Sequence, residues 1–519
     1  AQISTTKGTK ENQIYDMYSE YSESVRRIAP HRILAIDRGE REEALKVSVE
    51  IDQQICVGMI ENQVIHRNSP FAKALHEVCE DSFKRLIFPS LERELRAQLT
   101  EKACAQAIGV FSENLKNLLM QPPVKGCVTM GFDPAYRTGC KIAVVDETGK
   151  VLDTTVVYPT PPQNRTEQAK QVLGSLIEKY GVTVIAIGNG TASKESEIFV
   201  AELLSELNPK LGHKVSYMVV SEAGASVYSA SKLGAEEFPQ FDVSLRSAVS
   251  IARRLQDPLA ELVKIDPKAI GVGQYQHDMP PKEMDAALGG VVEDCVNKVG
   301  VDLNTASQSL LSYVAGINAA VAKNIVLYRE ENGSFTKRSQ LLSVSKLGKK
   351  AYEQCAGFLR VSESENPFDH TGVHPESYEA AKQLLTLCGY QMKDVLSGEI
   401  AQLPERVQAL GGTEQTARRI GVGEPTLKDM MEELLKPGRD PRDELPKPLL
   451  RTDVMEMKDL KPGMILKGTV RNVIDFGAFV DIGVHQDGLV HISQCALTRV
   501  AKVEDAVQVG QIVRVKVLG

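Results

Sequence analysis

Near its C-terminus the chain carries the stretch Gly468-Thr-Val-Arg-Asn-Val-Ile-Asp-Phe-Gly-Ala-Phe-Val-Asp-Ile-Gly483, followed by Gly488-Leu-Val-His-Ile-Ser493. The apolar residues have strand spacing, and the glycine between the two phenylalanines lets a strand bend so that a twisted barrel can close. Two aromatic side chains beside such a bend are hard to bury together. We therefore expect Phe476, Phe479 and His491 to lie on one open face, where each stacked base contributes about 1–3 kcal/mol.

Three cations, Lys467, Arg471 and Arg514, are placed to follow the phosphates of a bound strand. The F-x-x-F spacing alone is also compatible with two core phenylalanines in a small barrel. Taken together, the two stretches resemble the OB-type RNA-binding domain named after a ribosomal small-subunit protein, over residues 460–519. Such a barrel needs one more strand than the sequence supplies, so we expect residues 451–519 to form a barrel truncated before its last strand.

Composition places the chain among soluble multidomain proteins. Its 519 residues suggest about three to five domains, and 42% hydrophobic with 25% charged residues is ordinary for globular proteins. No apolar run is long enough to cross a membrane, and residues 1–10 lack the apolar core of a secretion signal. Nine dispersed cysteines without zinc-ligand spacing indicate reduced thiols in a cytoplasmic setting, with no metal and no cofactor. Because the net charge is −7, nucleic acid must be held by local basic patches.

Residues 1–124 are predicted to be mainly helical, with one strand over residues 44–51, and the two prolines after Gln121 end this region. Residues 125–245 then show three consecutive strands followed by alternating helices and strands. The predicted strands are 128–133, 140–146, 151–158, 182–187 and 215–220, and the helices are 165–180 and 194–207. This order is that of the ribonuclease H-like fold.

Residues 246–304 are interpreted as a helical connector, and residues 305–362 as two helix-hairpin-helix elements. The two hairpin turns are Ser312-Tyr-Val-Ala-Gly-Ile-Asn318 and Val344-Ser-Lys-Leu-Gly-Lys-Lys350. Backbone N–H groups at such turns can hold phosphate, and nearby lysines add charge. The candidate residues are Gly316, Asn318, Lys323, Gly348, Lys349 and Lys350. The alternative is a simple structural turn.

Residues 363–450 are expected to form a helical segment that ends in a linker rich in proline and charge, residues 436–448. Such a composition predicts a tether that lets the C-terminal barrel move.

The ribonuclease H-like segment matches only part of a nuclease site. These nucleases hold two divalent metals with several carboxylates. Asp133 stands at the end of the first strand, in a run similar to the G-x-D-x-G-x-x-x-G opening of the resolvase-like branch. Where the family has further carboxylates, this sequence has Asn189 and Ser247, and Glu195 or Asp242 are the possible substitutes. We therefore expect the ribonuclease H-like fold without nuclease activity, and no catalytic residue.

No other enzyme class has support. The glycine pairs at 188–190 and 271–273 lack the phosphate-binding spacings. His277 and Asp278 form a possible base and orienter, but adjacent loop residues of this kind are more often a hydrogen-bonding scaffold.

In its order of domains and in several long runs, the chain resembles the Tex family of bacterial transcription accessory proteins. The runs are residues 31–39, 186–193, 221–230, 252–264 and 271–278. The resemblance implies a multidomain, mainly α-helical protein with an α/β ribonuclease H-like (YqgF-type) domain and a C-terminal OB-fold β-barrel. It also implies a cytoplasmic transcription accessory factor, and we expect the family's upstream helix-turn-helix region to be missing here.

The ligand predicted for this chain is RNA or single-stranded DNA, with the barrel as the main site and no membrane partner. Two alternatives remain open. One is a metal-dependent nuclease that uses Asp133, and the other is a scaffold that docks on polymerase or the ribosome.

Overall fold

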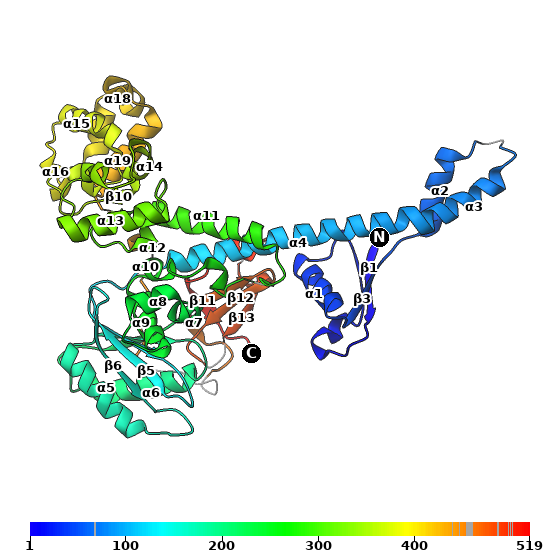
Figure 1. The fold of residues 1–519 in the computed structure, drawn as a ribbon, viewed down its shortest axis with the longest axis horizontal. Helices are drawn as coiled ribbons and strands as arrows, with labels where there is room; N and C mark the ends of the chain where they lie inside the picture. Colours follow the sequence, from blue (N-terminus) through cyan, green and yellow to red (C-terminus); the bar gives the residue numbers. More distant parts are fainter. Residues whose placement is uncertain are drawn as a thin grey trace. The chain divides into compact units, whose positions relative to one another are not determined.

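A computed structural model describes the whole chain except residues 67–68, 274, 439, 446, 453–459, 485–486, 497, 499 and 501. The described residues form two compact units (Figure 1). The first unit consists of Ala1–Glu113 and Val272–Ala287, and the second of Asn114–Gly271 and Leu288–Gly519. Among the described helices, none is long and apolar enough to cross a membrane.

The first unit contains an antiparallel sheet in the order β2-β1-β3, beside its helices. The strands are β1 (Gln2–Lys7), β2 (Glu20–Ser24) and β3 (Leu45–Glu50). The sequence predicted only β3 in this region. Strand β1 was missed because Ile3 is its single apolar residue, and pairing on both edges rather than apolar alternation makes it a strand.

Helices make up the rest of the first unit. They are η1 (Gln13–Tyr18), α1 (Pro30–Arg41), α2 (Gln53–Val64), α3 (Ala72–Ser82), the π-helical turn η2 (Phe83–Ile87) and the first part of α4 (Phe88–Leu119). Ile33, Leu34 and Ile36 of α1 pack with Ile3 into one buried core.

The loop that contains His277 and Asp278 is pinned within the first unit. Arg38 Nε donates to Asp278 Oδ2 at 2.7 Å, and Arg41 pairs with the same carboxylate. At Gly273 a side chain would collide with the buried ring of Phe111. Asp278 is therefore held by two arginines and serves as scaffold.

The ribonuclease H-like domain of the second unit contains a five-stranded sheet in the order β6-β5-β4-β7-β8. Strands β4, β5 and β6 pair antiparallel, whereas β4, β7 and β8 are parallel. The strands are β4 (Thr129–Asp133), β5 (Cys140–Val145), β6 (Val151–Val157), β7 (Val184–Gly188) and β8 (Ser216–Val220). Every predicted strand of this domain is confirmed to within about two residues at each end.

Helices cover both faces of this sheet. Helices α5 (Thr166–Tyr180) and α6 (Ser193–Leu207) bury one face, with Leu173 and Leu203 in the core. Helix α9 (Val243–Gln256) covers the other, and it lies so close to β4 that a side chain at Gly131 would collide with the Ala248 carbonyl. This close approach brings the start of α9 to the end of β4.

Short helices follow α6 and continue to the barrel. They are α7 (Ala225–Ala230), α8 (Lys232–Glu237), α10 (Pro258–Leu262), η3 (Pro267–Ala269), α11 (Pro281–Val299, which spans the unit boundary), α12 (Gln308–Leu311), α13 (Ala319–Asn332), η4 (Arg338–Ser343), α14 (Lys349–Cys355), η5 (Ala356–Phe358), η6 (Pro367–His370), η7 (Pro375–Ser377), α15 (Tyr378–Leu387), α16 (Lys393–Ser397), α17 (Leu403–Ala409), α18 (Gly412–Ile420), α19 (Glu424–Leu435) and η8 (Pro441–Glu444). A short parallel pair, β9 (Val301–Asp302) and β10 (Leu359–Arg360), joins the two ends of the hairpin region.

A buried arginine ties the hairpin region to the helices that follow it. Arg338 Nη1 donates to the Val373 carbonyl at 2.8 Å and to the Tyr378 hydroxyl at 2.7 Å. Its backbone N–H donates to Asp369 Oδ2 at 3.0 Å. The charge is thus buried only because backbone carbonyls and Asp369 surround it.

The C-terminal module is a curled antiparallel sheet in the order β13-β12-β11-β14, as an OB-type barrel requires. The strands are β11 (Ile465–Ile474), β12 (Gly477–Asp481), β13 (Gly488–His491) and β14 (Ile512–Lys516), with two short 3₁₀ turns, η10 (Ile492–Gln494) and η11 (Val503–Asp505). Val470, Val473 and Val480 form its core with Val503. At Gly477 a side chain would lie 2.5 Å from the Val490 carbonyl, so the glycine permits close approach of β13.

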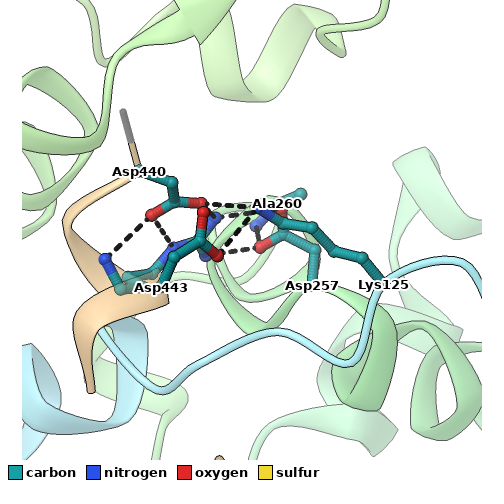
Figure 2. Close-up of polar contacts among 6 residues, drawn as sticks. Lys125, Asp257, Ala260, Asp440 and Asp443 are labelled. Carbon is teal, nitrogen blue, oxygen red and sulfur yellow. Dashed lines mark hydrogen bonds and ion pairs between the residues drawn. The ribbon is translucent and has the colours of Figure 1, made fainter. Parts of the chain in front are cut away.

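The segment predicted as a free tether is anchored where the structure describes it. Arg442 in η8 is buried, and its Nη1 donates to Asp257 Oδ1 at 2.7 Å while Nη2 donates to Asp440 Oδ2 at 2.9 Å (Figure 2). Lys125 Nζ donates to Asp440 at 2.9 Å, and Asp257 also caps α10 by accepting from the Ala260 N–H. This arginine clamp joins η8, the α9–α10 junction and the segment before β4, so residues 440–444 of the predicted tether are anchored, while movement of the barrel stays a prediction.

The stability of the clamp depends on each of its buried charges having an oppositely charged partner. Burial would raise the pKa of Asp440, but the Arg442 guanidinium and the Lys125 ammonium outweigh it and lower that pKa to about 2. This pairing could not be predicted, because a proline- and charge-rich composition does not show which charges find partners.

Replacement of Arg442 by alanine should destabilise the second unit by about 3–5 kcal/mol, because it leaves the buried carboxylate of Asp440 with Lys125 alone and removes the partner of the partly exposed Asp257. Differential scanning calorimetry should show a lower Tm for that unit. The matched control is Arg418→Ala, which removes an exposed pair with Glu414 and should cost about 0.5 kcal/mol or less. Equal Tm shifts for the two variants would contradict the clamp.

Candidate nucleic-acid interface

Strand register shows which barrel residues share the outer face. Val470, Val480 and Ala478 point into the core, so their neighbours Thr469, Asp481 and Phe479 point outward. The outer face continues to both edges of the sheet through the cross-strand pairs Phe479–Leu489 and Lys467–Arg514. It is called the outer face below.

The aromatic half of the outer face lies on β12 and β13. Phe479 is opposite Leu489, and His491 is two residues further along β13, on the same side. Phe476 lies in the turn between β11 and β12 and is 39% exposed, whereas Phe479 is half-buried. His491 is exposed, and its Nδ1 lies 2.9 Å from the Ser493 hydroxyl. The structure therefore brings the three predicted aromatic residues to one end of the barrel.

The cationic half lies on β11 and β14. Lys467 is directly opposite Arg514, Lys516 is opposite Ile465, and all three cations are exposed. Like charges placed opposite one another destabilise a sheet, so the pairing of Lys467 with Arg514 does not stabilise the fold. Within the described part of the chain, none of the three forms an ion pair. Lys516 and Leu489 were missed from the sequence, although alternation along each strand could have identified them.

Arg471 is placed differently from the prediction. It is the extra residue where the pairing of β11 with β12 shifts register, and its Nη2 donates to Asp481 Oδ2 at 2.6 Å. The side chain is only partly exposed. In this structure Arg471 neutralises a carboxylate of the outer face rather than extending the cationic half.

The two predicted hairpins share one backbone geometry. Gly316 has φ +81°, and Lys346 at the matching position has φ +66°. Two residues later, Asn318 and Gly348 are extended residues that cap α13 and α14. Each turn packs on the other hairpin, since a side chain at Gly316 would meet Gln354 and the Ser345 carbonyl accepts from Asn324 at 2.7 Å.

The second hairpin carries more charge than the first. Lys349 and Lys350 are exposed in the first turn of α14, and Lys346 is exposed in its turn. In the first hairpin only Lys323 is near, and Asn318 uses its side chain to cap the Val321 N–H at 3.0 Å. First-turn N–H groups have no partner within their own helix, so both turns can face phosphate.

A third hairpin was missed from the sequence. Gly421, with φ +74°, is followed by Val422 and by the extended Gly423, which starts α19. The signal was present as Ile420-Gly-Val-Gly423, which has the same spacing as the other turns. Here the first turn holds Glu424, paired with Lys428 at 2.8 Å, and a proline without an N–H. The first turn of this hairpin therefore carries an acid in place of the lysines of the second hairpin and offers fewer N–H groups.

The end of β4 brings together part of a nuclease-like site. Asp133 is partly buried, and its burial and the nearby charge of Glu222 raise its pKa to about 6, although a hydrogen bond from Ser247 and the charge of Lys141 oppose the shift. Burial also raises the pKa of Glu222, against a bond from the Gly190 N–H and the charge of Arg254. Glu222 follows β8 and was missed, because it stands outside the family's usual carboxylate positions.

The other predicted positions have separate roles. Asn189 Oδ1 accepts from the Glu222 N–H at 2.9 Å, Glu195 accepts from the Tyr136 hydroxyl at 2.7 Å, and Asp242 caps α9 through the Leu245 N–H at 2.8 Å. In the part of the chain that the structure describes, no group of three or more His, Cys, Asp and Glu side chains is arranged to hold a metal. These residues do not fit the two-metal site of the fold.

The domains described above match known family models in order. The matches are a Tex central region-like model (residues 1–111), a Tex protein YqgF-like domain (127–256), a helix-hairpin-helix motif (296–360), an HHH domain (366–442) and an S1 RNA binding domain (459–519). Together they define a multidomain protein that combines a YqgF-like domain with hairpin and S1 modules.

Curated relatives match nearly the whole chain. The uncharacterised protein YdcI of Bacillus subtilis is 54% identical over 512 residues, which are 98% of this chain and 70% of YdcI. The transcriptional accessory protein Tex of Neisseria gonorrhoeae is 47% identical over 98% of this chain and 66% of its own length. The human S1 RNA-binding domain-containing protein 1 is 38% identical over 97% of this chain and 56% of its own length. The chain belongs to the Tex family, and it spans about two thirds of the length of these bacterial relatives.

Replacement of Asp133 by asparagine should stabilise the protein at pH 8 but not at pH 3.5. With a pKa of about 6 when folded against an ordinary value of 3.8, ionised Asp133 costs the folded state stability, and that cost develops as the pH rises from about 4 to 6. The gain above pH 6 should be about 3 kcal/mol. Thermal unfolding of the wild type and the variant at both pH values measures this gain. The same stability difference between the two proteins at both pH values would show that the aspartate ionises normally.

Proposed function

We propose that this chain is a non-enzymatic transcription accessory factor that binds RNA or single-stranded DNA on the outer face of its S1 barrel. The observation that carries the proposal is the opposed pair Lys467–Arg514 on the face that also holds Phe479 and His491. A bound phosphate backbone would relieve the repulsion between the two cations, and the aromatic rings would stack on bases.

The hairpins supply a second contact to the nucleic-acid backbone. The lysines at the start of α14 and the N–H groups of its first turn suit phosphate, which carries no sequence information. Binding there is therefore expected to be insensitive to sequence. Stacking on the barrel tolerates any base as well.

A metal-dependent nuclease is the second candidate, because Asp133 and Glu222 place two carboxylates near one another at the end of β4. Two carboxylates are fewer than two metals need, and Ser247 and Asn189 carry no charge. A scaffold that docks on polymerase or the ribosome is the third. It would retain a protein partner while failing to bind free nucleic acid.

Replacement of Phe479 by alanine should weaken binding of a labelled twelve-nucleotide RNA about 5- to 100-fold, because one stacking contact contributes about 1–3 kcal/mol. Fluorescence anisotropy measures the Kd, and circular dichroism checks that the half-buried position still folds. The control is Phe71→Ala, an exposed phenylalanine of the first unit, which should leave the Kd unchanged.

A denaturing gel of the same samples with magnesium or manganese separates the candidate functions. Intact RNA supports the binding factor. Metal-dependent cleavage that disappears in Asp133→Asn would establish the nuclease, and equal Kd values for Phe479→Ala and the wild type would contradict the barrel as the site.

Alanine at Lys467, Arg514 or Lys516 should flatten the salt dependence of binding. Each cation that contacts phosphate contributes about 0.7 to the slope of log Kd against log salt for a single strand. Titrations from low to moderate salt give that slope. Arg418→Ala removes one exposed positive charge from α18 and serves as the matched control. Unchanged slopes for all three barrel variants would remove the cationic half from the site.

A further inference from the structure

The barrel contacts the rest of the second unit partly through its outer face. Asn114, near the end of α4, donates its Nδ2 to Asn472 Oδ1 at 3.1 Å and to the Val473 carbonyl at 3.3 Å. Asn472 is paired with Phe479 in the register of β11 and β12, so it belongs to the outer face. Asn114 itself is buried. The end of α4 therefore covers the outer face at Asn472, the residue opposite Phe479.

A second set of contacts comes from the ribonuclease H-like domain. Lys194 Nζ in α6 donates to the Gly483 carbonyl, just after β12, at 3.2 Å. The Arg451 guanidinium lies 3.6 Å from Asp481 of the outer face and 4.0 Å from Glu197 of α6. These contacts and those of Asn114 approach the barrel beside β12 and β11, the strands at the centre of the outer face.

The chain before the barrel is fixed to the same domain. Arg451 forms an isolated antiparallel bridge with Tyr217 of β8, with N–H to carbonyl distances of 2.8 and 2.7 Å in the two directions. The arginine clamp at Arg442 anchors the chain earlier. The barrel can thus leave its contacts with α4 and α6 while the preceding segment stays attached.

We propose that these contacts hold the barrel in a docked state that competes with nucleic acid for the outer face. The proposal rests on the function proposed above. A base stacked beside Phe479 must displace Asn114 from Asn472, so part of its binding free energy goes into undocking. The measured association constant is then the intrinsic association constant multiplied by the fraction of the protein that is undocked.

Two variants weaken docking without touching the outer face. Asn114→Ala removes the α4 contact, and Lys194→Ala removes the α6 contact. Lys232→Ala is the matched control, because Lys232 is an exposed lysine of the same unit whose partner is Glu236 on its own helix. The RNA is the labelled twelve-nucleotide strand, and the full chain is used throughout.

Both docking variants should bind this RNA more tightly than the wild type, up to about tenfold if about nine tenths of the wild type is docked. Lys194→Ala should do so although it loses a positive charge, whereas Lys232→Ala should not bind more tightly. If Asn114→Ala fails to fold by circular dichroism, Lys194→Ala alone decides the question. In the wild type, RNA should also speed hydrogen exchange in the peptides that contain Asn472 and Val473.

Docking variants that bind RNA no more tightly than the wild type, with exchange at residues 472–473 unchanged by RNA, would overturn the competition while leaving the proposed function intact. Failure of the wild type to bind RNA would overturn both. Equal tightening in Lys232→Ala would show that the effect is not specific to the docking contacts and would also overturn the competition.

Discussion

The buried guanidinium of Arg442 is the constraint on which the layout of the second unit depends. It lies between Asp257, at the junction of two helices of the ribonuclease H-like domain, and Asp440, in the segment that leads to the barrel (Figure 2). A buried cation with two carboxylates tolerates the loss of none of its partners, because each lost partner leaves an uncompensated charge. The chain therefore enters the barrel region from a fixed point, and the pairing of Arg451 with β8 extends that fixed path.

Beyond this point the barrel has one outer face that carries two kinds of side chain, aromatic and cationic. Its core strands need only alternating apolar residues, so the outward positions are free to carry function. On one side they hold aromatic rings, and on the other they hold cations that repel one another across the pair Lys467–Arg514. In the described residues of the ribonuclease H-like domain, by contrast, no group of three or more His, Cys, Asp and Glu side chains is placed to hold a metal. This domain contacts the barrel through the bond from Lys194 to the Gly483 carbonyl.

Much of this could be predicted from the sequence, for physical reasons that differ by region. Strands β4, β5 and β7 of the ribonuclease H-like domain are almost wholly buried, so their continuous apolar runs placed them within about two residues. Phe476, Phe479 and His491 could be assigned to one end of the barrel because strand periodicity fixes the side on which a residue points. Strand β1 could not be predicted, since Ser4 and Thr5 are buried by neighbouring strands that only the tertiary fold supplies.

Charge partners were the least predictable feature. Arg471 was assigned to phosphate, yet a shift of register turns it toward Asp481. The role of Arg442 depends on Asp257, far away in the sequence. Glu222 reaches the neighbourhood of Asp133 from a different strand end, which no local spacing reveals. In each case the residue type was visible, but the partner was set by long-range packing.

Photochemical cross-linking followed by mass spectrometry can test directly whether nucleic acid lies on the outer face of the barrel. A uridine-rich RNA carrying a photoreactive base is bound to the full chain, irradiated and digested, and the modified peptides are mapped. Binding on the outer face predicts cross-links concentrated in peptides that contain Phe476, Phe479, Leu489 and His491. Cross-links confined to residues 127–256, with none in the barrel, would contradict it.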